Sequence, residues 1–214
     1  MPTSSNPRKA TPRSRMTAAE RREQLITTAR GLFAERGFDG ATVEMVAARA
    51  EVSKPVVYEH FGGKEGLYAV VVDREVTHLL AMMRSALTSG TSRTLLEQAA
   101  LTLLDYIEVQ PDGFRILVRD SPIGTRGVSF QSIIGDTASR VEGILVDQFK
   151  KRGLDANTAP MYAQMLVGMV GTTGQWWMAT DGKPAKEVVA AHVVNMAWNG
   201  LSGLEEDPRL VTGD

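Results

Sequence analysis

The stretch that most constrains the fold is residues 42–64, TVEMVAARAEVSKPVVYEHFGGK. Its first half predicts a helix that begins after Thr42, an N-cap residue, because apolar side chains recur there at helical spacing. Glu51-Val52 form a turn. Ser53 then caps a second helix, and Pro55 lies in its first turn, where the missing N–H does little harm. Two helices joined by so short a turn predict a helix-turn-helix, whose second helix can enter the major groove of DNA.

The residues before this stretch predict one helix preceded by a basic arm. Residues 1–17 are rich in Pro, Ser and Thr and hold four Arg or Lys but no acid. We therefore expect a disordered arm there, either a solvated tail or a segment that lies along DNA phosphates. The sequence Thr17-Ala-Ala-Glu20 is a capping box that opens a helix to about Arg36, and Gly37 ends that helix.

The residues after this stretch predict further helices and no strands. A long helix is expected from near Lys64 to about Leu87, followed by a loop of small residues. The remaining expected helices are 93–109, 111–119, 128–152, 158–180 and 184–204, before a flexible tail at 206–214. Gly153 is expected to cap a helix C-terminus, and Pro111 and Pro184 fit first-turn positions.

The composition excludes several classes of protein. The chain has no cysteine, so disulfides and thiolate metal sites are excluded, and its three histidines are scattered. We expect no metal and no cofactor. The N-terminus lacks the apolar core of a signal peptide, and residues 161–180, although uncharged, contain too much Gly, Gln and Thr for a membrane span. We therefore expect a cytoplasmic protein with no membrane partner.

The distribution of charge matters more than its sum. The net charge is −1, but the first 65 residues carry +3 and the remainder −4. The positive end of the chain therefore coincides with the predicted helix-turn-helix, as expected for binding to DNA phosphates.

The first helix, the sequence AARAEVSKPVVYEHF and the continuation GGKEGLY together resemble the N-terminal domain of TetR-family transcriptional regulators. The resemblance covers residues 18–78, with the helix-turn-helix at about 41–60. It implies an all-α fold, in which an N-terminal three-helix helix-turn-helix DNA-binding domain is followed by a helical ligand-binding and dimerisation domain at residues 79–205. Glu51 departs from the family pattern, which commonly has Gly in this turn. A non-Gly residue at positive φ costs about 1 kcal/mol.

By the same resemblance, residues 53–60 form a recognition helix. Lys54, Pro55 and Val56 lie at the helix end that points into the groove, where lysine suits guanine or phosphate and the apolar residues suit thymine methyl groups. The other predicted DNA contacts, at helix ends and along the sugar-phosphate backbone, are Thr42, Ser53, Tyr58, His60 and Lys64. Each has a structural alternative, such as capping for the Thr and Ser residues.

The resemblance also implies a small-molecule pocket among the C-terminal helices and a dimer interface built by the last two long ones. Methionine and aromatic side chains line adaptable apolar sites, so we expect an apolar or amphipathic effector such as a lipid or acyl compound. The predicted lining residues are Tyr106, Phe114, Leu117, Phe130, Ile134, Met165, Met169 and Trp176. For each of them the alternative is a plain core position.

These patterns predict a ligand-responsive regulator that binds a pseudo-palindromic DNA operator as a homodimer. We expect repression, with activation as the alternative. A helical enzyme is a weaker alternative, because the sequence has no nucleophile elbow, no HExxH zinc motif and no glycine-rich phosphate loop. A nonspecific DNA-binding protein is a further alternative, but it should carry more positive charge.

Overall fold

The computed structural model describes residues 16–87, 90–118, 130–206 and 208. The described elements are all helical, and their order is α1 (Ala18–Gly40), α2 (Val43–Arg49), α3 (Lys54–Phe61), α4 (Lys64–Ala86), α5 (Ser92–Val109), α6 (Pro111–Val118), α7 (Phe130–Arg152), the 3-10 turn η1 (Ala156–Thr158), α8 (Ala159–Ala179) and α9 (Lys186–Ser202). The all-α prediction is therefore confirmed. The predicted arm at 1–17, apart from its last two residues, and most of the predicted tail lie outside the described residues.

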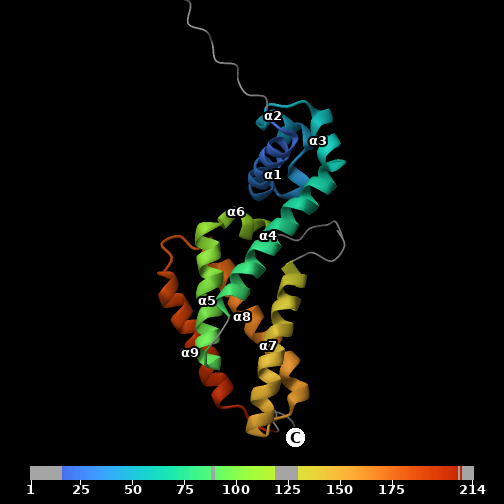
Figure 1. The fold of residues 1–214 in the computed structure, drawn as a ribbon. Coiled ribbons are helices and arrows are strands. Elements are labelled where there is room, and N and C mark those ends of the chain that lie inside the picture. Colours follow the sequence, from blue (N-terminus) through green and yellow to red (C-terminus); the bar gives the residue numbers. More distant parts are fainter. Residues whose placement is uncertain (1–15, 88–89, 119–129, 207, 209–214) are drawn as a thin grey trace, which may run out of the picture.

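Helices α1, α2 and α3 form a head at one end of the molecule, and α4 runs from this head into a body made of α5 to α9 (Figure 1). Within the body, α5 packs against α4, α6, α8 and α9, while α7 packs mainly against α8. The predicted domain boundary at 78/79 falls inside α4, which is one continuous helix. Head and body therefore share a helix and are not joined by a linker.

The core of the head is built under the helix-turn-helix. Phe33 of α1 is 1% exposed and meets the ring of Tyr68 edge-on, with centroids 4.9 Å apart. Phe38 packs on the same tyrosine at 5.0 Å. Val46 of α2 and Val57 of α3 are buried in the same cluster. These contacts fix both short helices against α1 and α4, because isolated helices of this length are unstable in water.

Several helix ends lie where the capping residues in the sequence predict them. The capping box between Thr17 and Glu20 is present, and the Met45 N–H donates to the Thr42 hydroxyl at 3.2 Å. Gly37 breaks α1 with φ 73°, although a short helical segment continues to Gly40. Gly153 ends α7 at φ 74°.

Two predicted helix starts differ in part from the structure. Ser53 occupies the N-cap position of α3, but its hydroxyl accepts no capping hydrogen bond. Pro55 has no N–H to offer, and the Val56 N–H donates to the Ser53 carbonyl at 3.1 Å instead. Pro184 lies before α9, whose N-cap is Ala185, and not in its first turn. Its carbonyl accepts the indole N–H of Trp177 at 2.8 Å.

The turn between α2 and α3 adopts the strained conformation that its sequence left open. Glu51 has φ 54°, and among the described residues it is the one non-glycine residue with positive φ. Its backbone N–H donates to the Ala48 carbonyl at 3.2 Å, and the Val52 N–H donates to the Ala47 carbonyl at 2.9 Å. This chain therefore keeps the left-handed turn without the glycine that favours it.

Candidate DNA interface and apolar cavity

The outward face of α3 presents the N-terminal residues predicted to read DNA. Lys54, Pro55 and Tyr58 are exposed, Tyr58 to 46%. Val57 between them is fully buried, which fixes the rotation of the helix about its axis. Val56 is half-buried and packs against the core, so only part of its apolar surface faces outward. His60 is half-buried, with its ring centroid 6.0 Å from that of Phe61.

Lys54 is held by a carboxylate from the neighbouring helix. Its ammonium group forms an ion pair with Glu44 of α2 and lies 5.6 Å from the centroid of the Tyr58 ring. The hydrogen bond from Lys54 lowers the pKa of Glu44 to about 2, assisted by the Glu44 backbone amide and by Thr42. The same pairing raises the pKa of Lys54. In the free protein the positive charge of Lys54 is therefore compensated by the carboxylate of Glu44.

Lys64 joins the start of α4 to the end of α1. Its ammonium nitrogen lies 4.2 Å from the centroid of the Phe38 ring and 3.5 Å from the carbonyl oxygen of Asp39. The Thr42 hydroxyl accepts the capping bond from Met45 at 3.2 Å and is also hydrogen-bonded to the Glu44 carboxylate. All eight predicted DNA-contact residues lie in the helix-turn-helix or the first turn of α4, and their contact with DNA stays a prediction.

Sequence reasoning missed Glu44. A first-turn acid is an ordinary feature of a helix N-terminus, where it favours the helix dipole, so its identity alone gives no hint of a partner on the next helix. The sequence therefore gives no specific signal for this pair, and it becomes visible only when α2 and α3 are packed together.

The body holds an apolar cavity of about 130 Å³. Its walls come from α4, α5, α7, α8 and α9, and no charged side chain is found among the lining residues that the structure describes. The lining residues are Leu79, Met83, Leu87, Ser92, Leu95, Leu96, Ala99, Leu103, Val141, Ile144, Leu145, Leu166, Val167, Val170, Gly171, Trp198 and Leu201.

The cavity is lined by residues other than those predicted. Tyr106, Phe114 and Leu117 are buried in the main core, and Met169 packs against it half-buried. Met165 and Trp176 are more than half exposed on α8. The side chains of residues 130 and 134 lie outside the described part of the structure. The cavity lies instead among mainly aliphatic side chains, together with Trp198. Contact of the predicted set with an effector stays a prediction.

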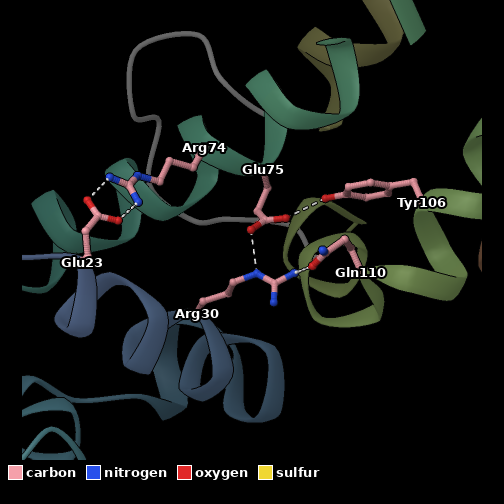
Figure 2. Close-up of polar contacts among 6 residues, drawn as sticks. All are labelled: Glu23, Arg30, Arg74, Glu75, Tyr106 and Gln110. Atoms are coloured by element: carbon pink, nitrogen blue, oxygen red, sulfur yellow. Dashed lines mark hydrogen bonds and ion pairs between the residues drawn. The ribbon is translucent and has the colours of Figure 1, made fainter. Parts of the chain in front are cut away.

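A buried polar cluster lies where the head meets the body (Figure 2). Glu75 of α4 is 8% exposed, and its two carboxylate oxygens accept bonds from opposite sides. Arg30 Nε of α1 donates to Oε1 at 2.6 Å, and the Tyr106 hydroxyl of α5 donates to Oε2 at 2.7 Å. Arg30 Nη2 also donates to Gln110 Oε1 at 2.7 Å. Burial, and then the Glu75 charge, raise the pKa of the Tyr106 hydroxyl far above its ordinary value.

The described ranges contain no group of three or more His, Asp or Glu residues placed to hold a metal ion. In the same part of the chain, no helix combines the length and the apolarity needed to cross a bilayer.

The family model, the related sequences and the related structure that match this chain all describe the same kind of protein. The family model "Bacterial regulatory proteins, tetR family" matches residues 25–71, which hold the helix-turn-helix. The HTH-type transcriptional activator FasR of Mycolicibacterium smegmatis is 32% identical over 190 residues, covering 88% of this chain and 86% of FasR. The HTH-type transcriptional repressor AcnR of Corynebacterium glutamicum is 26% identical over 120 residues, or 56% of this chain and 62% of AcnR. The crystal structure of a TetR-like transcriptional regulator from Rhodococcus sp. RHA1 superposes with a TM-score of 0.69 at 25% identity, covering 89% of this chain and all of that one.

Proposed function

Because this chain belongs to the TetR family of bacterial transcriptional regulators, we propose that it binds a pseudo-palindromic operator as a homodimer under the control of a small apolar molecule. It is a DNA-binding regulator and not an enzyme. The observation that carries the proposal is the outward face of α3, where Lys54, Pro55 and Tyr58 are exposed around the fully buried Val57. This arrangement presents the N-terminal end of a rigidly seated helix to a major groove.

The proposed dimer uses α8 and α9. Helix α8 contains no charged residue, yet it exposes Met161, Met165 and Trp176 to 49%, 56% and 53%. Met196 of α9 is 71% exposed. Large apolar side chains gathered on two neighbouring helices favour burial against another surface. In a homodimer that surface is the same face of a second copy. Two recognition helices would then enter successive major grooves about 34–36 Å apart.

The proposed effector enters the apolar cavity of the body. A cavity of about 130 Å³ without a charged lining suits a benzene-sized apolar group, and a long acyl chain would have to displace its walls. Those walls include Leu79, Met83 and Leu87 of α4, the helix that continues into the head. Filling the cavity would therefore bias the position of the head, and couplings of this kind are typically about 1–3 kcal/mol.

For the sign of regulation, we propose activation. The activator FasR matches 88% of this chain, whereas the repressor AcnR matches 56% of it. Repression, which we expected from the sequence, is the alternative. A reporter gene placed behind the operator decides between them, because an activator raises expression above that of a strain lacking this chain and a repressor lowers it.

The binding proposal is tested by capturing genomic fragments on the purified protein and titrating the captured DNA against random DNA at fixed salt. A specific regulator binds its site at least about 10³-fold more tightly than random DNA. Equal affinities would instead support a nonspecific DNA-binding protein. A thermal-shift screen with fatty acids, acyl compounds and aromatic compounds tests the effector. Absence of any shift across that panel contradicts the apolar-effector proposal.

A further inference from the structure

Glu75 is an unusual residue for its position. It lies four residues after Val71 and four before Leu79, so it shares the buried stripe of α4 with residues that are 1% and 2% exposed. A carboxylate within such a stripe is costly unless its oxygens are paired. Both oxygens are paired here, each with a residue from a different part of the fold, as Figure 2 shows.

The partners of Glu75 come from opposite sides of the junction between head and body. Arg30 belongs to α1, which packs against α2 in the head and also against α6, and Tyr106 belongs to α5 in the body. Arg30 reaches the body a second time through Gln110, the C-cap residue of α5. The Gln110 carbonyl in turn accepts the Phe114 N–H at 3.1 Å in α6. One guanidinium thus links α1 to α4 and to the corner between α5 and α6.

The α6 backbone closes the remaining side of the cluster. A Cβ atom on Gly113 would lie 2.0 Å from Glu75 Oε2 and 2.5 Å from the Tyr106 hydroxyl oxygen. Glycine is therefore required there, and the carboxylate has no room to shift toward α6. The packing of α1 on α4 and α6 already restricts their arrangement, and the directional hydrogen bonds of Glu75 add a constraint that depends on the positions of α1, α4 and α5 together.

We propose that Glu75 is a positioning residue for operator binding, fixing with Arg30 and Tyr106 the angle between the head and the body. This inference rests on the proposed function, because the angle matters only if two heads of a dimer must match two half-sites. Helix α1 carries the recognition helix with it. Arg22 of α1 lies over the ring of Phe61 at the end of α3, 4.6 Å from its centroid, and the buried Val57 seats α3 in the same core.

The chain offers a matched control on the same two helices. Arg74 of α4 forms a bidentate pair with Glu23 of α1, and Figure 2 shows it beside the Glu75 cluster. Both side chains of this pair are about half exposed, at 46% and 56%. The two hydrogen bonds of this pair join α4 to α1 and involve no residue of α5 to α9. Losing it removes an ion pair between α1 and α4 without releasing the head from the body.

The test measures affinity for a set of operators whose half-sites are separated by spacers that differ by single base pairs. The proteins compared are the full-length wild type, Glu75→Gln, Tyr106→Phe and the control Glu23→Gln. Each added base pair changes both the separation and the rotation of the half-sites, so a fixed head angle gives one preferred spacer. A change in global stability alone would not alter which spacer is preferred.

The expected result is that Glu75→Gln and Tyr106→Phe reduce the ratio between best and next-best spacer by at least about fivefold, or move the best spacer, while Glu23→Gln keeps the wild-type profile. Tyr106→Phe removes only the hydroxyl group that donates to Glu75. If Glu75→Gln does not fold, the spacer profile of Tyr106→Phe therefore tests the proposal. A wild-type profile for Tyr106→Phe and for any folded Glu75→Gln overturns the role of Glu75. A wild type that distinguishes none of the spacers contradicts operator binding by a dimer itself.

Discussion

Lys54, the first residue of the recognition helix, forms an ion pair with Glu44 in the first turn of the preceding helix. Both side chains are about half exposed, at 49% and 60%, so the pair contributes little to stability. We expect the Lys54–Glu44 ion pair to affect the binding of DNA instead. A phosphate or guanine that bound Lys54 would have to replace Glu44, and we expect this competition to weaken nonspecific contacts with DNA.

We predict that Glu44→Gln strengthens binding to random DNA and steepens its salt dependence. The substitution removes one anion from the surface and frees Lys54 for a phosphate. One additional phosphate contact should make the slope of log K against log salt more negative by about 0.9. Salt titrations of wild type and variant by fluorescence anisotropy check this.

The matched control for that titration is Glu97→Gln. Glu97 pairs with the exposed Arg93 on α5, in the body, so its loss changes the net charge equally but frees no cation near α3. Equal slopes for Glu44→Gln and Glu97→Gln would show that overall charge, and not the release of Lys54, determines the effect.

We predict that the double variant Tyr58→Ala with Lys64→Ala weakens operator binding by about tenfold to a hundredfold, while the helical fold and the dimer remain. Tyr58 is exposed, and the Lys64 ammonium lies over the Phe38 ring and against the Asp39 carbonyl without entering the core, so we expect the fold to survive both changes. Anisotropy gives the affinity and circular dichroism the fold. Lys151→Ala, at an exposed position of α7, serves as the control that should leave affinity unchanged. Unchanged affinity in the double variant would remove this surface from the interface.

We predict that Glu51→Gly stabilises the protein by up to about 1 kcal/mol, because glycine tolerates the φ of 54° that strains Glu51. Glu59→Gly, an equivalent exchange at an exposed helical position of α3, should destabilise it by a similar amount. Urea midpoints at constant m-value measure both. A lower midpoint for Glu51→Gly would show that the turn is not strained.

We predict that Trp176→Arg dissociates the proposed dimer, because each copy would place a charge in the proposed interface, to which α8 otherwise contributes no charged residue. Val109→Arg, at an apolar position that is 69% exposed on α5, should leave the dimer intact. Sedimentation velocity separates the two species. A dimer that survives Trp176→Arg would place the interface elsewhere.

The features that the sequence predicts well are helix ends, which depend on only a few neighbouring residues. The capping box at Thr17, the cap at Thr42 and the glycine at 153 act on their own helix ends, and all three are confirmed. The predicted role of Pro184 is wrong for a tertiary reason, since its carbonyl is taken by the Trp177 indole of the preceding helix.

The cavity and the Glu75 cluster depend on contacts between distant segments. Glu75 meets partners 45 residues earlier and 31 residues later in the chain. The sequence does contain a signal, a carboxylate at core spacing between Val71 and Leu79, but it does not name the partners. The cavity gives no such signal, because it arises where aliphatic side chains from five helices fail to meet.

The most direct test of the central claim, that α3 reads DNA as one half of a dimer, is selection of bound duplexes from a random pool by the full-length protein. We predict enrichment of a pseudo-palindrome with half-sites about one helical turn apart, bound by two copies and lost from the pool selected with the Tyr58→Ala, Lys64→Ala variant. Enrichment of no sequence, or of a single unrepeated site bound by one copy, would contradict it.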